Sequence, residues 1–179
     1  MGHLTNMEIK ARCTDQDSVR EFLRDGHADF KGVDRQIDTY FKVSSGRLKL
    51  REGDIENFLV FYDREEKQGP KESKVILFRA DPASALKEML VRSLGVLVVV
   101  DKRREIYFID NVKFHVDVVE ALGTFIEIEA IDADGSIGKQ RLLEQCHRYV
   151  DLLGIQEHHL VPRSYSDLLL ENAEQGSSM

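Results

Sequence analysis

The chain has 179 residues and a formal net charge of −7, with 42% hydrophobic and 32% charged residues. This length predicts one domain over residues 1–179, with its core at about 5–170 and a flexible tail at 171–179. The negative charge argues against general binding to nucleic acid or to an anionic membrane, and no apolar run approaches the ~20 residues that cross a bilayer. Cys13 and Cys146 have no metal-ligand spacing, so we expect reduced thiols and a cytoplasmic protein.

Alternation of polar and apolar residues with a period of two is the main signal from the N-terminus onward, and it predicts β-strands. Residues 6–13 alternate in this way, with charged side chains on one parity. A helix is expected over 15–24, where Thr14 is a candidate cap and Gly26 follows the end. The next predicted strands cover 36–43 and 47–51.

The rest of the chain continues as strands, with three more helices. Strands are predicted over 57–64, 74–80, 96–104, 105–109, 112–118 and 124–131. Helices are predicted over 82–94, over 136–153, and from Tyr165, where Ser164 and Asp167 form a capping box. Short turns such as Ser44-Ser45-Gly46 and Asp110-Asn111 separate several strands, which favours a largely antiparallel sheet.

These strands keep one apolar parity, while the other parity concentrates charge. Two arrangements would bury the apolar parity: a sheet covered by helices on one side, or an α+β fold in which an antiparallel barrel of about eight strands carries helices outside and a polar lumen inside. For any single strand, the simplest alternative is a solvent-exposed face whose charges prevent aggregation with other strands. The same pattern on several strands favours the barrel with an internal binding site.

The predicted charged wall has more bases than acids. Its nine bases are Lys10, Arg12, Arg47, Lys49, Arg51, Arg64, Arg79, Lys102 and Arg104. Its four acids are Glu8, Asp117, Glu127 and Glu129. His115 shares a parity with Lys113 and Asp117 and could lie on this wall, but a structural role is the simpler interpretation. An excess of five positive charges in an acidic protein suits a polyanion that arrives with a metal ion.

The residue types of this wall match phosphate and metal chemistry. Arg presents a planar fork to phosphate oxygens and Lys acts as a point charge, and alternate residues on a strand stand ~6.6 Å apart. Arg47, Lys49 and Arg51 can therefore address successive phosphoryl groups. Glu127 and Glu129 share one strand face, where their oxygens can bind Mg²⁺ or Mn²⁺ together with substrate phosphates.

The ordered set of motifs resembles the CYTH family of class IV adenylyl cyclases and thiamine triphosphatases, and its cyclase-like branch in particular. It comprises Asn6-Met7-Glu8-Ile9-Lys10, the basic run 47–51, the pair Lys102 and Arg104, Asp117, and 122–129. The family signature begins with Glu where this chain has Asn6, which removes one candidate metal ligand.

The resemblance implies a triphosphate tunnel with a Mg²⁺ or Mn²⁺ ion held by Glu8, Glu127 and Glu129, and Asp117 is a further candidate ligand. It also implies that the nine bases bind the substrate phosphates. Lys10, Glu8 and Arg51 are the candidate catalytic residues, and Lys10 has two candidate roles: orienting the phosphate or activating water.

The candidate functions all require that the basic side chains bind a triphosphate. The first is metal-dependent hydrolysis of tripolyphosphate, thiamine triphosphate or a nucleoside triphosphate, with positioning and electrostatics as the main sources of catalysis. The second is cyclisation of ATP to cyclic AMP and pyrophosphate, and the third is a non-catalytic polyphosphate or nucleotide sensor. The expected partner is a small-molecule triphosphate rather than nucleic acid or a membrane, for a monomer or homodimer. The helix from Tyr165 lies either in the tunnel or outside it.

Overall fold

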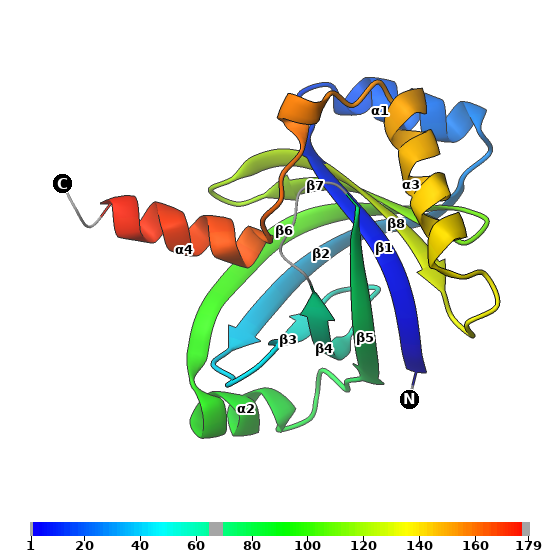
Figure 1. Cartoon of the computed structure of the whole chain (residues 1–179). Helices are drawn as coiled ribbons and strands as arrows, with labels where there is room; N and C mark the ends of the chain where they lie inside the picture. Colours follow the sequence, from blue (N-terminus) through cyan, green and yellow to red (C-terminus); the bar gives the residue numbers. More distant parts are fainter. Residues whose placement is uncertain (1, 65–69, 177–179) are drawn as a thin grey trace.

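The computed structural model describes residues 2–64 and 70–176. Within these residues the strands close into an antiparallel barrel in the order β1-β5-β4-β3-β2-β6-β7-β8 (Figure 1). The strands are β1 (Gly2–Arg12), β2 (Asp29–Phe41), β3 (Arg47–Glu52), β4 (Phe58–Arg64), β5 (Lys71–Arg79), β6 (Val96–Ile109), β7 (Val112–Val119) and β8 (Gly123–Asp132). The predicted α+β barrel is therefore confirmed.

The largest differences from the predicted strands are in β6 and β2. The segments expected at 96–104 and 105–109 form one continuous strand, β6, because no turn residue interrupts them. Strand β2 starts at Asp29, well before the predicted start at residue 36. A register shift between Phe30 and Gly32 breaks the alternation there, so the simple period-2 pattern is lost although the pairing continues.

Three helices lie on the outside of the barrel wall. Helices α1 (Gln16–Asp25) and α3 (Lys139–Leu152) lie at the side of the barrel formed by β1 and β8, and α2 (Leu86–Leu94) lies at the opposite end (Figure 1). Helix α1 is capped by Asp15, whose carboxylate accepts from the Ser18 N–H at 3.1 Å, rather than by Thr14. None of the helices within 2–64 and 70–176 is long and apolar enough to cross a membrane.

The main core lies between the barrel wall and helices α1 and α3. The outward parity of β1 packs there with the apolar faces of β7, β8 and both helices. Its fully buried members include Met7, Phe114, Ile128, Leu142 and Cys146. Burial of this parity fixes the orientation of β1, because a one-residue slip would turn Glu8 and Lys10 outward.

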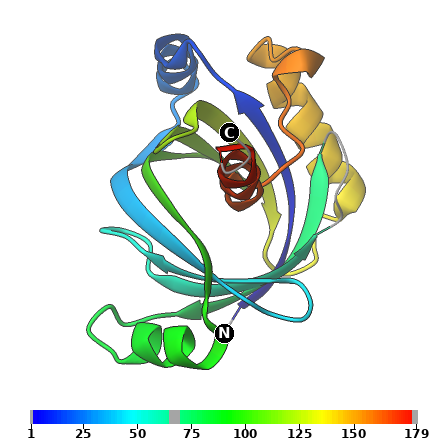
Figure 2. The same ribbon diagram turned by 90° about the vertical axis from the view of Figure 1, so that its left-hand side faces the viewer.

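Helix α4 (Tyr165–Gly176) follows the 3₁₀ turn η1 (Glu157–His159) and stands at one opening of the barrel. Figure 2 shows it end-on inside the outline of the barrel, with its C-terminal end pointing outward. The predicted capping box is confirmed: the Asp167 N–H donates to Ser164 Oγ at 3.1 Å, and the Ser164 N–H donates to the Asp167 carboxylate at 3.2 Å. The helix continues to Gly176, so the first part of the predicted tail is helical.

Candidate active site

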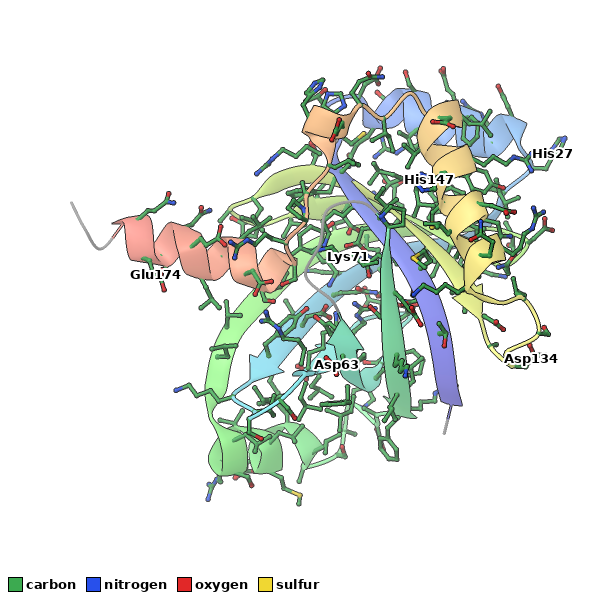
Figure 3. All side chains as sticks on the ribbon, in the orientation of Figure 1. His27, Asp63, Lys71, Asp134, His147 and Glu174 are labelled. Carbon is green, nitrogen blue, oxygen red and sulfur yellow. The ribbon has the colours of Figure 1, made fainter. Side chains whose placement is uncertain are left out.

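A cavity of about 150 Å³ lies inside the barrel. In the part of the chain that the structure describes, each of the eight strands contributes residues to its lining. A cavity needs roughly 10–15 Å³ by this measure to hold one water molecule, so the space admits a small ligand. Figure 3 shows side chains filling much of the space between the walls. The first turn of α4 closes one end, since Ser164 and Tyr165 also line the cavity.

Three cations converge on Asp38, which is buried on β2. Its carboxylate accepts from Lys49 Nζ at 2.8 Å, from Arg51 Nε at 2.9 Å and from Lys102 Nζ at 2.7 Å. Burial would raise the pKa of Asp38, but the charges of Arg51, Lys102 and Lys49 hold it well below its ordinary value. These three predicted phosphate ligands are thus held together by one carboxylate.

Glu56 enters the cavity from the loop between β3 and β4. Its carboxylate accepts from Arg51 Nη1 at 2.9 Å and also pairs with Lys113 of β7. The buried Asp34 shapes this loop by accepting the N–H groups of Ile55 at 2.9 Å and of Glu56 at 3.0 Å. Although burial opposes ionisation, the charges of Arg51 and Lys113 hold the pKa of Glu56 far below its ordinary value.

Arg104 is clamped between two carboxylates. Its guanidinium donates to Asp117 at 2.8 and 2.5 Å and to Glu127 at 2.7 Å. The Tyr165 hydroxyl also donates to Asp117, at 2.8 Å. Asp117 is fully buried behind Arg104 and does not line the cavity, so in this structure it positions Arg104 rather than facing a ligand.

Strands β1 and β8 carry the carboxylate side of the cavity. Glu8 lies directly opposite Glu129 in the register, and Lys10 lies opposite Glu127, with 3.1 Å between Lys10 Nζ and Glu127 Oε1. Asn6 Nδ2 donates to Glu129, while the buried Asn6 Oδ1 has no hydrogen-bond partner. Like charges directly opposite each other destabilise a sheet. Here Lys10 Nζ lies 3.9 Å from Glu8 Oε1, and Lys113 of β7 lies opposite Glu129 on its other side.

This side fits a hard divalent cation. Carboxylate and amide oxygens are the ligands that Mg²⁺ and Mn²⁺ prefer, and Glu8, Glu129 and the unpartnered Asn6 oxygen supply them. No group of three or more His, Cys, Asp or Glu side chains is gathered closely enough to hold a metal among residues 2–64 and 70–176. Glu127 instead pairs with Lys10 and Arg104, so metal binding requires some of these ion pairs to exchange.

His115 is a cavity residue on β7. Its Nδ1 lies 3.0 Å from Glu127 Oε2, and its buried Nε2 has no hydrogen-bond partner. Burial, together with the charges of Arg104 and Lys113, lowers the pKa of His115 to about 4, so the imidazole is neutral at pH 7. With its Nδ1 proton donated to Glu127, Nε2 is left as an acceptor for a ligand N–H or O–H.

Of the nine predicted bases, Arg12, Arg47 and Arg79 do not line the cavity. Arg12 is exposed and donates to the Leu122 carbonyl at 3.1 Å, and Arg79 is exposed at the end of β5. Arg47 forms an ion pair with Asp167 of α4 at 2.7 Å. The side chain of Arg64 lies outside the described residues.

The charge balance of the described cavity also differs from the prediction. Its bases are Lys10, Lys49, Arg51, Lys102, Arg104 and Lys113, and its acids are Glu8, Asp38, Glu56, Glu127 and Glu129. These six bases and five acids replace the expected nine and four. The sequence does not single out Asp38, because polar residues fall on both parities of its strand, nor Glu56, because it lies in a loop. Lys113 shares a strand face with His115, and this parity was a signal that Lys113 lies on the charged wall.

The same architecture and motifs occur in known proteins. A family model described as the CYTH domain matches residues 4–165. The chain belongs to the CYTH family. A relative from Methanocaldococcus jannaschii, named "Putative adenylate cyclase MJ0240", is 27% identical over 181 residues, which cover 92% of this chain and 98% of the relative.

Solved structures of the family's fold agree with this assignment. The PH1012 protein of Pyrococcus horikoshii OT3 is 26% identical with a TM-score of 0.77, over 91% of this chain and 98% of that protein. The Pct1 RNA triphosphatase of S. pombe has a TM-score of 0.54 at 9% identity, over 89% of this chain and 86% of that chain. At 9% identity, the similarity to the S. pombe protein shows a common fold and nothing more.

Proposed function

We propose that this CYTH-family protein is a divalent-metal-dependent phosphohydrolase that binds a triphosphate inside the barrel. The proposal rests on the arrangement of Lys49, Arg51 and Lys102 around one buried carboxylate, in a cavity inside the barrel whose β1–β8 side bears Glu8 and Glu129. Cations held in fixed positions bind a polyanion without reorganising at the moment of reaction. The M. jannaschii relative carries the name of an adenylate cyclase, an enzyme that acts on a triphosphate, and this supports triphosphate chemistry.

Each side of the cavity has its own part in the proposed reaction. Glu8, Glu127, Glu129 and Asn6 Oδ1 would hold Mg²⁺ or Mn²⁺, which when bound neutralises phosphate charge. The bases of β3, β6 and β7 bind and orient the phosphates: Lys49, Arg51, Lys102, Arg104 and Lys113. Arg51 and Lys10 also counter the charge that develops on the attacked phosphoryl group, and Lys10 lies on the carboxylate side where it can orient that group.

Cyclisation of ATP is the second candidate. The name of the M. jannaschii relative favours it, and the cavity has room beside the phosphate-binding cations. Cyclisation requires the ribose 3′-hydroxyl to approach the α-phosphate, whereas hydrolysis requires water at the terminal phosphate. The phosphate ligands are common to both reactions.

Product analysis separates the candidates. Purified protein is incubated with ATP, thiamine triphosphate or tripolyphosphate, each with Mg²⁺ or Mn²⁺. Release of orthophosphate supports hydrolysis, and cyclic AMP with pyrophosphate supports cyclisation. Tight tripolyphosphate binding without turnover of any compound would identify a sensor and refute the enzyme proposal.

A carboxylate variant tests the metal assignment. Glu127→Gln is expected to lower kcat/KM by more than about 100-fold, because it removes a metal ligand and a partner of Lys10 and Arg104. Glu120→Gln, on the exposed turn after β7, is the matched control and should retain activity. Full activity of Glu127→Gln would contradict the assignment.

A further inference from the structure

One part of the cavity wall is apolar. Strand β4 contributes Phe58, Val60 and Tyr62, and strand β5 contributes Val75 and Leu77. We call these five residues the apolar wall. They line the same cavity as the cations, although the charged-wall prediction placed Arg64 and Arg79 on these two strands.

The apolar wall is continuous across the two strands. The register pairs Tyr62 with Val75 and Val60 with Leu77. Between Val75 and Leu77 on β5, Ile76 points to the outer face, where it is 37% exposed. Alternation along the strand therefore places Val75 and Leu77 in the lumen and Ile76 on the outer face of the barrel.

The apolar wall lies across the barrel from a wall of cations. In the order of the eight strands around the barrel, β4 lies four positions from β7, and β5 lies four positions from β6. Strands β6 and β7 carry Lys102, Arg104 and Lys113. At the edge of the apolar wall, Val60 is also the cross-strand partner of Lys49. A ligand in this cavity meets cations on one side and hydrocarbon on the other.

The apolar wall belongs to a hydrophobic cluster that also contains Tyr165 and Leu168 of α4, but this cluster does not fill the lumen. A packed interior leaves few voids larger than a water molecule, whereas Phe58, Val75 and Leu77 are only partly buried and border the cavity. Inorganic tripolyphosphate presents charged oxygens on all sides, and oxygens turned toward hydrocarbon lose their hydrogen bonds to water without replacement. An organic group placed there instead gains apolar contact.

We propose that the substrate is a triphosphate monoester whose organic group is apolar or aromatic and lies against the apolar wall, so that the enzyme selects against inorganic tripolyphosphate. The inference rests on the proposed triphosphate function and adds the chemical class of the organic group that is attached to the triphosphate. Ser73, whose buried Oγ lacks a hydrogen-bond partner, lies next to this wall on β5 and can bind one polar group of the ester.

A series of triphosphate probes, two of them esters of equal charge, tests the preference. We would measure kcat/KM with Mn²⁺ for methyl triphosphate, phenyl triphosphate and inorganic tripolyphosphate. Burial of a phenyl ring in place of a methyl group should raise kcat/KM at least about tenfold. Tripolyphosphate should be a poorer substrate than the phenyl ester. Equal or better use of tripolyphosphate, or equal use of the two esters, would overturn the inference.

Neighbouring residues on β5 provide matched variants. Val75→Lys adds a cation to the apolar wall and should shift the ratio of kcat/KM for tripolyphosphate over phenyl triphosphate at least about tenfold toward tripolyphosphate. Ile76→Lys adds the same charge on the outer face and should leave the ratio unchanged. Thermal unfolding of each variant confirms that it is folded.

A conservative variant keeps the test decisive if Val75→Lys does not fold. Val75→Thr has nearly the same volume and should lower the phenyl-to-methyl preference several-fold, because it places a hydroxyl against the organic group. An unchanged preference in every folded Val75 variant would refute the role of the apolar wall while leaving triphosphate turnover intact. Absence of both binding and turnover with all three probes would instead refute the proposed function.

Discussion

Lys102 Nζ lies 2.7 Å from Asp38 Oδ2, and both side chains are almost completely removed from solvent. Lys49 and Arg51 share the same carboxylate. Burial of such a pair costs hydration free energy, which the mutual attraction and the additional hydrogen bonds offset. In the free protein the Asp38 carboxylate therefore neutralises the same three side chains that are proposed to bind a phosphate group.

Asp38→Asn should destabilise the free protein and strengthen its response to an anion. Removal of one partner from a buried ion pair costs about 3–5 kcal/mol, because the three cations then repel one another. Tripolyphosphate should restore more stability to the variant than it adds to the wild type, since the anion replaces the missing charge. Urea unfolding with and without tripolyphosphate measures both effects. Asp101→Asn, which removes an exposed ion pair with Arg35, is the control, and equal responses of Asp38→Asn and the wild type would contradict the account.

Binding of a triphosphate near pH 8 should take up protons at Lys102. Burial, with the charges of Arg51, Arg104 and Lys49, outweighs the attraction of Asp38 and lowers the pKa of Lys102 to about 7, so the free amine is mostly neutral at pH 8. A bound polyanion raises that pKa again. Calorimetry in buffers of different ionisation enthalpy should detect the proton uptake, and Lys102→Arg should remove it. Uptake that persists in the variant would exclude Lys102 as its source.

The same shift has a defined effect on stability. Between pH 7 and the ordinary lysine range the unfolded chain binds more protons at Lys102 than the folded protein does. The contribution of this group to the free energy of unfolding therefore rises with pH across that window. Lys102→Met should flatten this part of the pH dependence, and an unaltered profile would show that another group dominates.

Glu129→Gln should separate metal binding from folding. The substitution relieves the repulsion from Glu8, so the metal-free protein should be as stable as the wild type or more stable. Stabilisation by Mn²⁺ should be lost together with activity, because an oxygen ligand is neutralised. Thermal midpoints with Mn²⁺ and with EDTA test this, and Glu144→Gln on the exposed face of α3 is the control. Undiminished Mn²⁺ stabilisation would place the metal elsewhere.

Asp167→Asn should loosen helix α4 at the mouth of the barrel. The carboxylate pairs with Arg47 and accepts from the Ser164 hydroxyl at 2.6 Å, so its loss weakens both the cap and the attachment to β3. We expect a stability loss of about 1 kcal/mol and faster amide exchange in α4. Glu171→Gln, which removes an ion pair between two partly exposed side chains within the same segment, should have a smaller effect. Equal exchange rates in the two variants would argue against the contact with Arg47 as the anchor.

The alternation of Glu8 and Lys10 against Met7 and Ile9 predicted which face of β1 lines the cavity, because side-chain direction in a strand follows directly from sequence parity. Local signals also sufficed for the capping box of α4. Where both parities are apolar, as in Leu59-Val60-Phe61-Tyr62, alternation does not distinguish lumen from exterior. The apolar wall could not be recognised from such a segment.

The sequence by itself thus determined the barrel, the family and most of the cations that face the cavity, since these depend on periodicity and on the order of motifs along the chain. Only the tertiary structure decided the charge balance of the site. Asp38 meets Lys102 across a strand pair far apart in sequence, and Glu56 reaches Lys113 from a loop, so both depend on closure of the barrel. The interior predicted as a largely basic wall is a nearly balanced ion-pair network that faces hydrocarbon across the lumen.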